Sequence, residues 1–334
     1  MRRRNTDKRI SSLSDKPWMS LSLIVCLLCW ILCFVYSIGF PSEKGEATIL
    51  LRTFSVLLFD DKLTAFLSCL IIMIVVAFVI QRISDIKMLI RKHTRLPFML
   101  FLLLASANAG LLSLREVAIV LLCLIFAIYN LFEAYQSPDA TDRHFNAGVM
   151  TGFAGLFMPP ILWFILLLWV GMYQLRSLNF RSFMASFIGM CIVYWIVTAW
   201  CLWNHDFSMM ASLYYRLTDF KILSPEVFQY YRIGSAVVVV ILVMAFFHIK
   251  MDTFGNSVRV RQMLSFLANM SVWSFILFLL YGEDSDSFMA VIYLPSSLLI
   301  TYFLENIRPV ICFVLFYFML FIWFASFLSR LWIF

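Results

Sequence analysis

Charged residues are scarce in this sequence of 334 amino acids. Asp, Glu, Lys and Arg make up 13% of the chain, whereas soluble domains carry about 25%. Hydrophobic residues account for 63% of the chain, and its mean hydropathy is +0.91. So little charge excludes an ordinary soluble domain. The composition predicts an integral membrane protein with almost the whole chain embedded.

Charge is also missing from the interior of the apolar runs. None of the 26 basic and 19 acidic residues lies near the middle of a predicted span. Proton pumps and ion-coupled carriers usually hold ionisable groups there, because a buried charge is costly unless it takes part in transport. This absence weighs against a secondary transporter. The sequence also lacks a P-loop, so an ATP-driven pump would need a separate subunit.

Patterns of metal ligands are missing as well. The eight cysteines all fall within predicted spans, where a thiol packs as a small apolar group. Cys26 and Cys29 have CxxC spacing, but no His or carboxylate lies nearby, and the four histidines are scattered at span ends. We therefore expect no metal site and no cofactor. The basic pI of about 9.0 is interpreted as a signal of topology beside anionic lipid, with no nucleic acid as partner.

Apolar runs of spanning length are abundant. Segments of about 17 to 25 apolar residues are typical of membrane-crossing helices, which satisfy their own backbone polar groups. We predict an all-α polytopic transmembrane bundle of about eleven spans (10 to 11) without a soluble domain. It comprises a basic cytoplasmic N-terminus over 1–17 and one transmembrane domain over 18–334, with outer segments at 40–63 and 204–231. The predicted spans are 18–39, 64–82, 97–112, 116–133, 145–157, 160–175, 183–203, 232–249, 263–281, 287–304 and 309–330.

The distribution of basic residues predicts the orientation. The first apolar run is about twice as long as a typical signal-peptide core and lacks a small-residue cleavage site, so we expect a retained helix and a cytoplasmic N-terminus. Lys and Arg accumulate on the cytoplasmic side. Two spans within 145–175 place 18 of the 26 basic residues inside, and one kinked span places 16 there. Two spans are narrowly favoured.

The stretch NAGVMTGFAGLFMPP, residues 146–160, combines three glycines at helical spacing with two consecutive prolines. A GxxxG face lets a second helix approach closely, and the prolines break the helix. Helix packing is the favoured interpretation. The alternative is irregular backbone that lines a cavity. The candidate residues for packing or for a cavity are Asn108, from the predicted span 97–112, together with Asn146, Gly148, Gly152, Gly155, Pro159 and Pro160.

The two long outer segments are candidates for chemistry. The first is predicted to form an interfacial helix that ends at Asp60 and Asp61. The second interleaves Tyr with Arg and Lys over 204–232. Such residues can hold sugar faces and pyrophosphate, but they are also typical of an aromatic belt at the membrane interface. We favour the belt.

Part of the chain resembles a known group of membrane proteins. The runs LREVAIVLLCLIFAIYNLFEAY and HFNAGVMTGFAGLFMPPILWFILLLWVGMYQLRSLNFRSFMASFIGM show a small-residue helix, a proline break and an Arg-bearing loop before an aromatic-glycine helix. This pattern resembles an uncharacterised multi-pass inner-membrane family of Bacteroidota. The resemblance covers roughly residues 50 to 200. It implies a bacterial inner membrane and no particular activity.

The layout is also similar to that of GT-C glycosyltransferases, which transfer sugars from polyprenyl-phosphate carriers. That similarity implies that Asp60 or Asp61 acts as general base, since adjacent like charges raise one pKa. It also implies that Arg115, Arg216 or Arg232 binds the lipid phosphate. The acids lie at the end of the outer loop, whereas GT-C enzymes usually carry theirs near the first helix. An analogy of fold alone does not establish function.

Three hypotheses of function follow. The favoured one is a non-catalytic subunit of a cell-envelope complex in the inner membrane, with membrane lipids and other membrane subunits as partners. The first alternative is a GT-C-like enzyme acting on a polyprenyl-linked saccharide at the outer leaflet. The second is a lipid or solute translocator, motivated by the break at Pro159 and Pro160. Whether the protein is an enzyme stays open.

Overall fold

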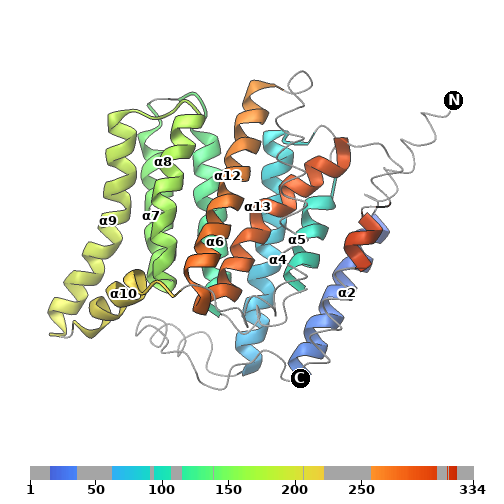
Figure 1. The fold of residues 1–334 in the computed structure, drawn as a ribbon, viewed down its shortest axis with the longest axis horizontal. Coiled ribbons are helices and arrows are strands. Elements are labelled where there is room, and N and C mark those ends of the chain that lie inside the picture. The colour runs from blue at the N-terminus through green and yellow to red at the C-terminus, as the bar shows by residue number, and fades with distance from the viewer. Residues whose placement is uncertain are drawn as a thin grey trace.

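A computed structural model shows the arrangement of the helices (Figure 1). It describes residues 16–35, 62–90, 94–106, 115–137, 139–205, 207–221, 257–306, 314 and 316–321. Within these ranges the regular structure is α-helix and short 3-10 helix, without a strand. The all-α prediction is therefore confirmed for the described part of the chain.

The described elements are α-helices, most of them apolar, and two short 3-10 helices, η2 and η3. Their bounds are α2 Lys16–Val35, α4 Lys62–Lys87, α5 Leu96–Ser106, α6 Arg115–Glu133, α7 Thr141–Phe157, η2 Pro159–Trp163, α8 Phe164–Gln174, α9 Phe180–Trp203, α10 Ser208–Thr218, α12 Val258–Leu280, η3 Gly282–Asp284 and α13 Ser285–Asn306.

Among the described residues, five helices are long and apolar enough to cross a membrane. Shorter apolar helices occur at Leu23–Leu32, Leu96–Ser106 and Pro159–Gln174. The predicted spans 232–249 and most of 309–330 lie outside the described residues. The helices are compatible with a multi-pass membrane protein. The five segments are Phe66–Lys87, Glu116–Glu133, Phe180–Trp203, Val258–Leu280 and Ser285–Asn306.

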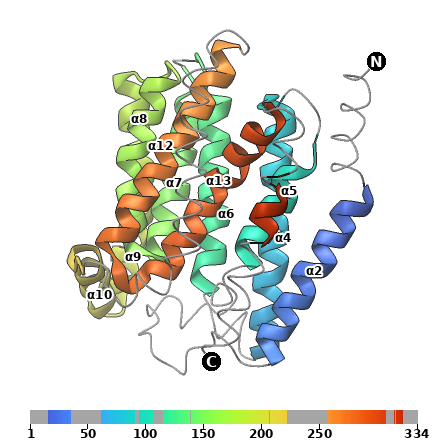
Figure 2. The ribbon, with the colours of Figure 1, turned by 45° about the vertical axis from the view of Figure 1, so that its right-hand side comes forward.

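Helix α13 forms the centre of the bundle. Its residues from Ser287 to Leu304 are all buried, and it packs on α12, α5 and α6. Figures 1 and 2 show α13 between the α7–α9 group on one side and α4 and α5 on the other, with α2 at the edge. Three buried hydroxyls within α13, those of Ser296, Ser297 and Thr301, donate to backbone carbonyls of the same helix.

Residues 141–175 fold into two antiparallel helices. Pro159 and Pro160 are buried at the start of η2, which turns the chain from α7 into α8. The far end of α8 returns to the start of α7, where the Gln136 amide donates to the Leu175 carbonyl at 3.1 Å. This geometry is the one that two spans require, and it differs from a single kinked helix.

Helices α7 and α9 run parallel and approach each other at backbone distance. A Cβ added to Gly148 would lie 2.1 Å from the Ser186 carbonyl oxygen, and one on Gly189 would lie 2.4 Å from the Phe145 carbonyl oxygen. Only a residue without a side chain fits at either position. The remaining surface of α9 stays open, with Trp195 76% and Trp203 83% exposed.

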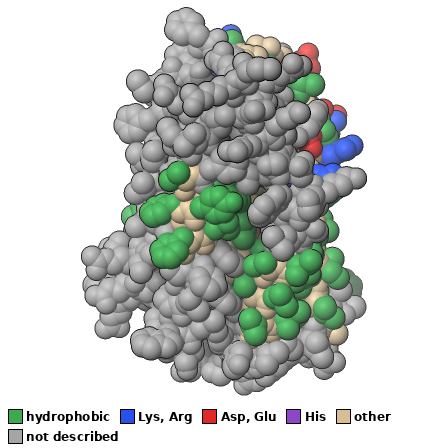
Figure 3. Space-filling model, turned by 90° about the vertical axis from the view of Figure 1, so that its right-hand side faces the viewer, with side chains coloured by type: hydrophobic (Ala, Val, Ile, Leu, Met, Phe, Trp, Pro, Cys, Tyr) green, Lys and Arg blue, Asp and Glu red, His purple; other side chains and the backbone are tan. Residues whose placement is uncertain are grey.

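At the end of the bundle where α7 begins, a buried cation joins two helices. The side chain of Lys87, at the end of α4, is 3% exposed and donates to the Glu133 carboxylate at the end of α6. The Lys87 ammonium also lies 5.6 Å from the centroid of the Tyr129 ring. In the space-filling view, the coloured charged side chains gather at the upper right, and coloured apolar side chains form patches in the middle and at the lower right (Figure 3).

Candidate functional site

Helix α10 lies across the end of the bundle opposite Lys87 (Figures 1 and 2). Its sequence, SMMASLYYRLT, places Met209 and Leu213 on one helical face, and both are buried. Tyr214 and Tyr215 are exposed. An apolar stripe at i and i+4 beside exposed tyrosines is typical of a helix lying on a bundle at a polar boundary.

Tyr281 fastens the C-terminal end of α10 to the bundle. Its hydroxyl donates to the Leu217 carbonyl at 2.6 Å and accepts from Trp163 Nε1 at 3.0 Å. The Phe220 ring lies 5.2 Å from the Tyr281 ring, and the Gly282 amide donates to the Lys221 carbonyl at 2.7 Å. Burial raises the pKa of Tyr281, because ionisation would place a phenolate among apolar rings.

A small charged cluster lies beside this contact. Arg216 Nη2 is 3.6 Å from Asp284 Oδ1, and Glu116, in the first turn of α6, interacts electrostatically with both residues. The cluster joins α6, α10 and η3. Arg216 Nη1 is buried without a hydrogen-bond partner among the described residues. The Asp284 carboxylate is therefore the ion-pair partner of the guanidinium among the described residues.

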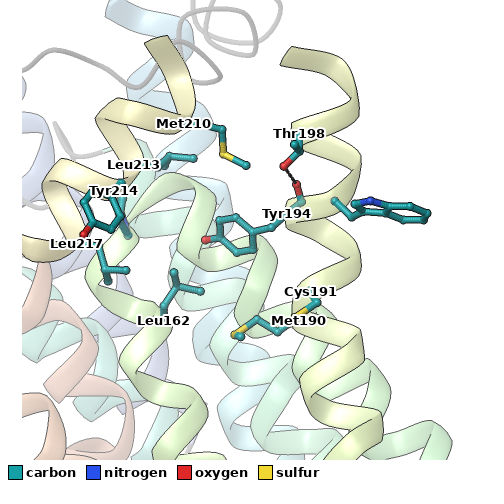
Figure 4. A pocket seen from close by; sticks show the side chains of 11 residues that line it. Leu162, Met190, Cys191, Tyr194, Thr198, Met210, Leu213, Tyr214 and Leu217 are labelled. Atoms are coloured by element: carbon teal, nitrogen blue, oxygen red, sulfur yellow. Dashed lines mark hydrogen bonds between the residues drawn. The ribbon is translucent and has the colours of Figure 1, made fainter. Parts of the chain in front are cut away.

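A groove of about 500 Å³ opens between α9, α10 and η2 (Figure 4). Its walls are apolar apart from a few side chains. Such a cavity, with apolar walls and few polar groups, is the usual form of a small-molecule site. The lining residues are Pro159, Leu162, Met190, Cys191, Tyr194, Trp195, Thr198, Met210, Leu213, Tyr214 and Leu217.

Tyr194 supplies the principal polar atom of the groove. Figure 4 shows its ring projecting from α9 toward α10 and Leu162. The hydroxyl oxygen is buried and has no hydrogen-bond partner among the described residues. The nearby Thr198 hydroxyl donates to the Tyr194 backbone carbonyl at 2.7 Å. A buried hydroxyl without a partner is costly, so this atom marks a place for an acceptor.

The structure describes some of the predicted site residues and leaves others outside its described ranges. Asp60, Asp61, Asn108 and Arg232 lie outside the described residues. Arg115 begins α6, next to Glu116, and so belongs to the same end of the bundle as Arg216. The structure thus brings Arg216 to two acids, Asp284 and Glu116, that were not predicted as site residues.

The small-residue stretch divides between packing and the groove. Asn146 is exposed. Gly148 and Gly152 face Ser186 and Met190 of α9, whereas Gly155 faces Leu162 and the Tyr194 hydroxyl. Pro159 lines the groove, and Pro160 is buried in the turn. The same glycine face therefore serves helix packing over most of its length and the groove at its end.

Sequence reasoning missed Tyr194, Tyr281 and Trp163. Each is an aromatic residue among many in apolar segments, and no local pattern distinguishes them. Asp284 ends η3 and Glu116 is in the first turn of α6, but their approach to Arg216 depends on how α10 crosses the bundle. Among the described residues, no three His, Cys, Asp or Glu side chains gather as a metal site would require.

The fold defines the class of protein as an all-helical bundle compatible with several membrane crossings. Its candidate site is an apolar groove beside a charged cluster. The chain belongs to the family of unknown function DUF6427, which it matches over residues 45–331. No curated protein and no solved structure matches the chain.

Proposed function

We propose that this protein is a non-catalytic, multi-pass subunit of a cell-envelope complex in the bacterial inner membrane, and that its groove holds an apolar molecule taken from the bilayer. The groove between α9, α10 and η2 is the observation that carries the proposal. Its lining is apolar and it lies next to the open face of α9. A hydrophobic molecule can therefore enter from the side.

The described charges support a binding role over a catalytic one. Lys87 and Glu133 tie α4 to α6, and Arg216 and Asp284 tie α10 to the turn before α13. Each pair joins elements that are distant in sequence, so these charges stabilise the fold. A role for Arg216 in binding a carrier phosphate, as in the GT-C-like alternative, would require the phosphate to compete with Asp284 and Glu116.

The enzyme alternative depends on Asp60 and Asp61. It stays a prediction, and it expects that Asp60→Asn and Asp61→Asn, correctly inserted, abolish glycan assembly in cells. The translocator alternative was motivated by Pro159 and Pro160. In the structure these prolines form a buried turn that leads α7 into α8, which supports a fixed connection between two helices.

Native mass spectrometry of the protein extracted in mild detergent tests the proposal. We expect two added masses, one of a small apolar molecule and one of a protein subunit. A lone chain that carries neither mass would contradict the proposal. If the small molecule is bound but no protein subunit is, the binding role stands and membership of a complex is contradicted.

A further inference from the structure

We propose that the groove takes one acyl chain of a membrane phospholipid, and that the Tyr194 hydroxyl donates a hydrogen bond to the ester carbonyl of that chain. This inference rests on the proposed binding role of the groove and names the class of its ligand. Four observations carry it: the shape of the groove, the orientation of Tyr194, the level of Tyr194 in the fold, and the pairing of Arg216.

The shape and lining of the groove fit a single hydrocarbon chain. Leu162, Met190 and Leu213 come from three different elements and form apolar walls around it. An acyl chain in the bilayer is already out of water, so the apolar walls favour a chain of methylene groups through close van der Waals contact. Methionine side chains from α9 and α10 adapt to irregular apolar shapes.

Tyr194 adds a requirement that a plain hydrocarbon does not meet. Its hydroxyl is buried and lacks a partner among the described residues. A neutral donor inside an apolar site discriminates strongly for a ligand that carries an acceptor, because the donor otherwise stays unpaired. An acyl chain brings such an acceptor, since its ester carbonyl lies at the head of the chain.

Tyr194 lies in the half of the bundle that ends at α10. Its hydroxyl lies next to Gly155, near the end of α7 where the chain turns into η2. Gly155 is 12 residues beyond Arg143 in α7, a rise of about 18 Å, whereas the hydrocarbon core is about 30 Å thick. The hydroxyl is therefore past the middle of the hydrocarbon, on the side from which the ester end of a lipid would enter the groove.

The nearest described arginine does not favour a phosphate inside the groove. Arg216 is 3.6 Å from Asp284 and interacts with Glu116. It is adjacent in sequence to Leu217, which lines the groove. Because the Asp284 carboxylate already faces its guanidinium, we assign a neutral ester to the groove in preference to an anionic head group.

Gly155 makes room for this arrangement. A Cβ at this position would lie 2.8 Å from the Tyr194 hydroxyl and 2.7 Å from Leu162 Cδ2. Both side chains border the groove. Any larger residue at position 155 would push them into the space that we assign to the acyl chain.

Two variants and one lipid pair test the inference on the full chain in mild detergent. Phosphatidylglycerol in its ester-linked and ether-linked forms is added, and the retained lipid is measured by native mass spectrometry. We expect wild-type protein to retain the ester form about five- to tenfold better, as one hydrogen bond allows. Tyr194→Phe removes that preference, whereas Tyr215→Phe, on the exposed face of α10, keeps it.

A second variant addresses the groove itself. Cys191 is an exposed residue of the groove lining, so Cys191→Trp fills the space with little risk to folding. We expect it to abolish retention of phosphatidylglycerol. Ile192→Trp is the matched control, because Ile192 is exposed on α9 and does not line the groove.

The outcomes separate the two proposals. If Cys191→Trp loses the lipid but wild-type protein retains ester and ether forms equally, the groove is a binding site and the ester contact is wrong. If wild-type protein and all variants retain the same amount of lipid, the lipid is annular only. That result overturns both the groove as a binding site and the ester contact. Preferential retention of polyprenyl phosphate over phosphatidylglycerol would overturn the assignment to a phospholipid. If Tyr194→Phe does not fold, the ester and ether comparison on wild-type protein decides.

Discussion

At the scale of single residues, the Lys87 side chain shows how this protein manages a buried charge. The ammonium is 3% exposed and depends on the Glu133 carboxylate and the Tyr129 ring. Glu133 is 35% exposed and can be hydrated without its partner. A pair so unequally buried should respond unequally to the loss of either member.

We predict that Glu133→Gln destabilises the protein more than Lys87→Met does. Removing the carboxylate leaves an unpaired ammonium in the interior, at a cost of about 3 kcal/mol, the lower end for buried pairs because Glu133 is partly exposed. Removing Lys87 leaves a carboxylate that water can reach, at a cost of about 1 kcal/mol. Thermal unfolding in detergent measures both, and equal losses would contradict the prediction.

The closest helix contact also depends on one residue. We predict that Gly148→Ala lowers thermal stability in detergent by about 1–3 kcal/mol, as overpacking does, because its Cβ would lie 2.1 Å from the Ser186 carbonyl oxygen. Gly152→Ala is the matched variant, since its Cβ would lie 3.0 Å from the nearest atom, and it should cost less. A smaller loss for Gly148→Ala than for Gly152→Ala would contradict the close contact.

At the scale of elements, α10 is a short helix whose position depends on the residues beneath it. Eleven residues are marginal as an isolated helix in water. Its own sequence contributes Met209 and Leu213 to the contact, and Tyr281 adds a hydrogen bond to Leu217. The groove exists only while α10 stays docked against α9 and η2.

We predict that Tyr281→Phe loosens α10 while the remainder of the bundle stays folded. The change leaves the Leu217 carbonyl and Trp163 Nε1 without their partner, a cost of about 1–3 kcal/mol. Hydrogen exchange should rise over residues 208–218 and stay unchanged in α13. Tyr129→Phe, far from α10, is the control, and unchanged exchange in α10 would contradict the role of Tyr281.

Alkaline pH should act through the same residue. The raised pKa of Tyr281 means that the folded protein keeps the proton above the ordinary tyrosine range near 10. The stability that this group contributes is therefore complete below that range and is lost as the pH rises through it. The effect of Tyr281→Phe on exchange in α10 should diminish accordingly at high pH.

At the scale of the whole molecule, the α7–α8 hairpin determines on which side every later segment lies. The contact of Gln136 with Leu175 brings the two ends of the hairpin together. Arg143 and Arg176 are therefore at one end of the bundle, and α10 is at the other. With the predicted cytoplasmic N-terminus, the arginine end faces the cytoplasm.

We predict that single cysteines at Arg143 and Arg176 react with an impermeant maleimide from the same side of sealed vesicles. A cysteine at Tyr214, on α10, should react from the opposite side. Inverted vesicles should reverse the pattern. Reaction of the positions 143 and 176 from opposite sides would mean that the segment crosses once, and would reverse the assigned orientation of the segments from residue 176 onward.

Local sequence features were enough to predict much of the fold. The length of the apolar runs predicted the helices, because within hydrocarbon each helix must satisfy its own backbone N–H and C=O groups. Pro159 and Pro160 gave the break, because proline cannot continue the preceding helix. Gly148 and Gly152 gave a packing face. These predictions depend on residues close to one another along the chain.

The candidate site could not be predicted in the same way. Trp163 and Tyr281 are 118 residues apart, and Tyr281 and Leu217 are 64 apart, so no local pattern links them. The similarity to GT-C enzymes implied Arg216 as one of three arginines that could bind a lipid phosphate, and the structure places it against Asp284. The partner of a charged side chain is decided by the crossing of helices.

The sequence by itself determined the helical class of the described part of the chain and the break at Pro159 and Pro160, because each follows from hydrophobic length or from backbone constraints within a few turns. Only the tertiary structure decided which helix faces the glycines, how α10 lies across the bundle, and that Tyr194 points into a groove. Those features arise where residues distant in sequence compete for the same space, and packing alone resolves that competition.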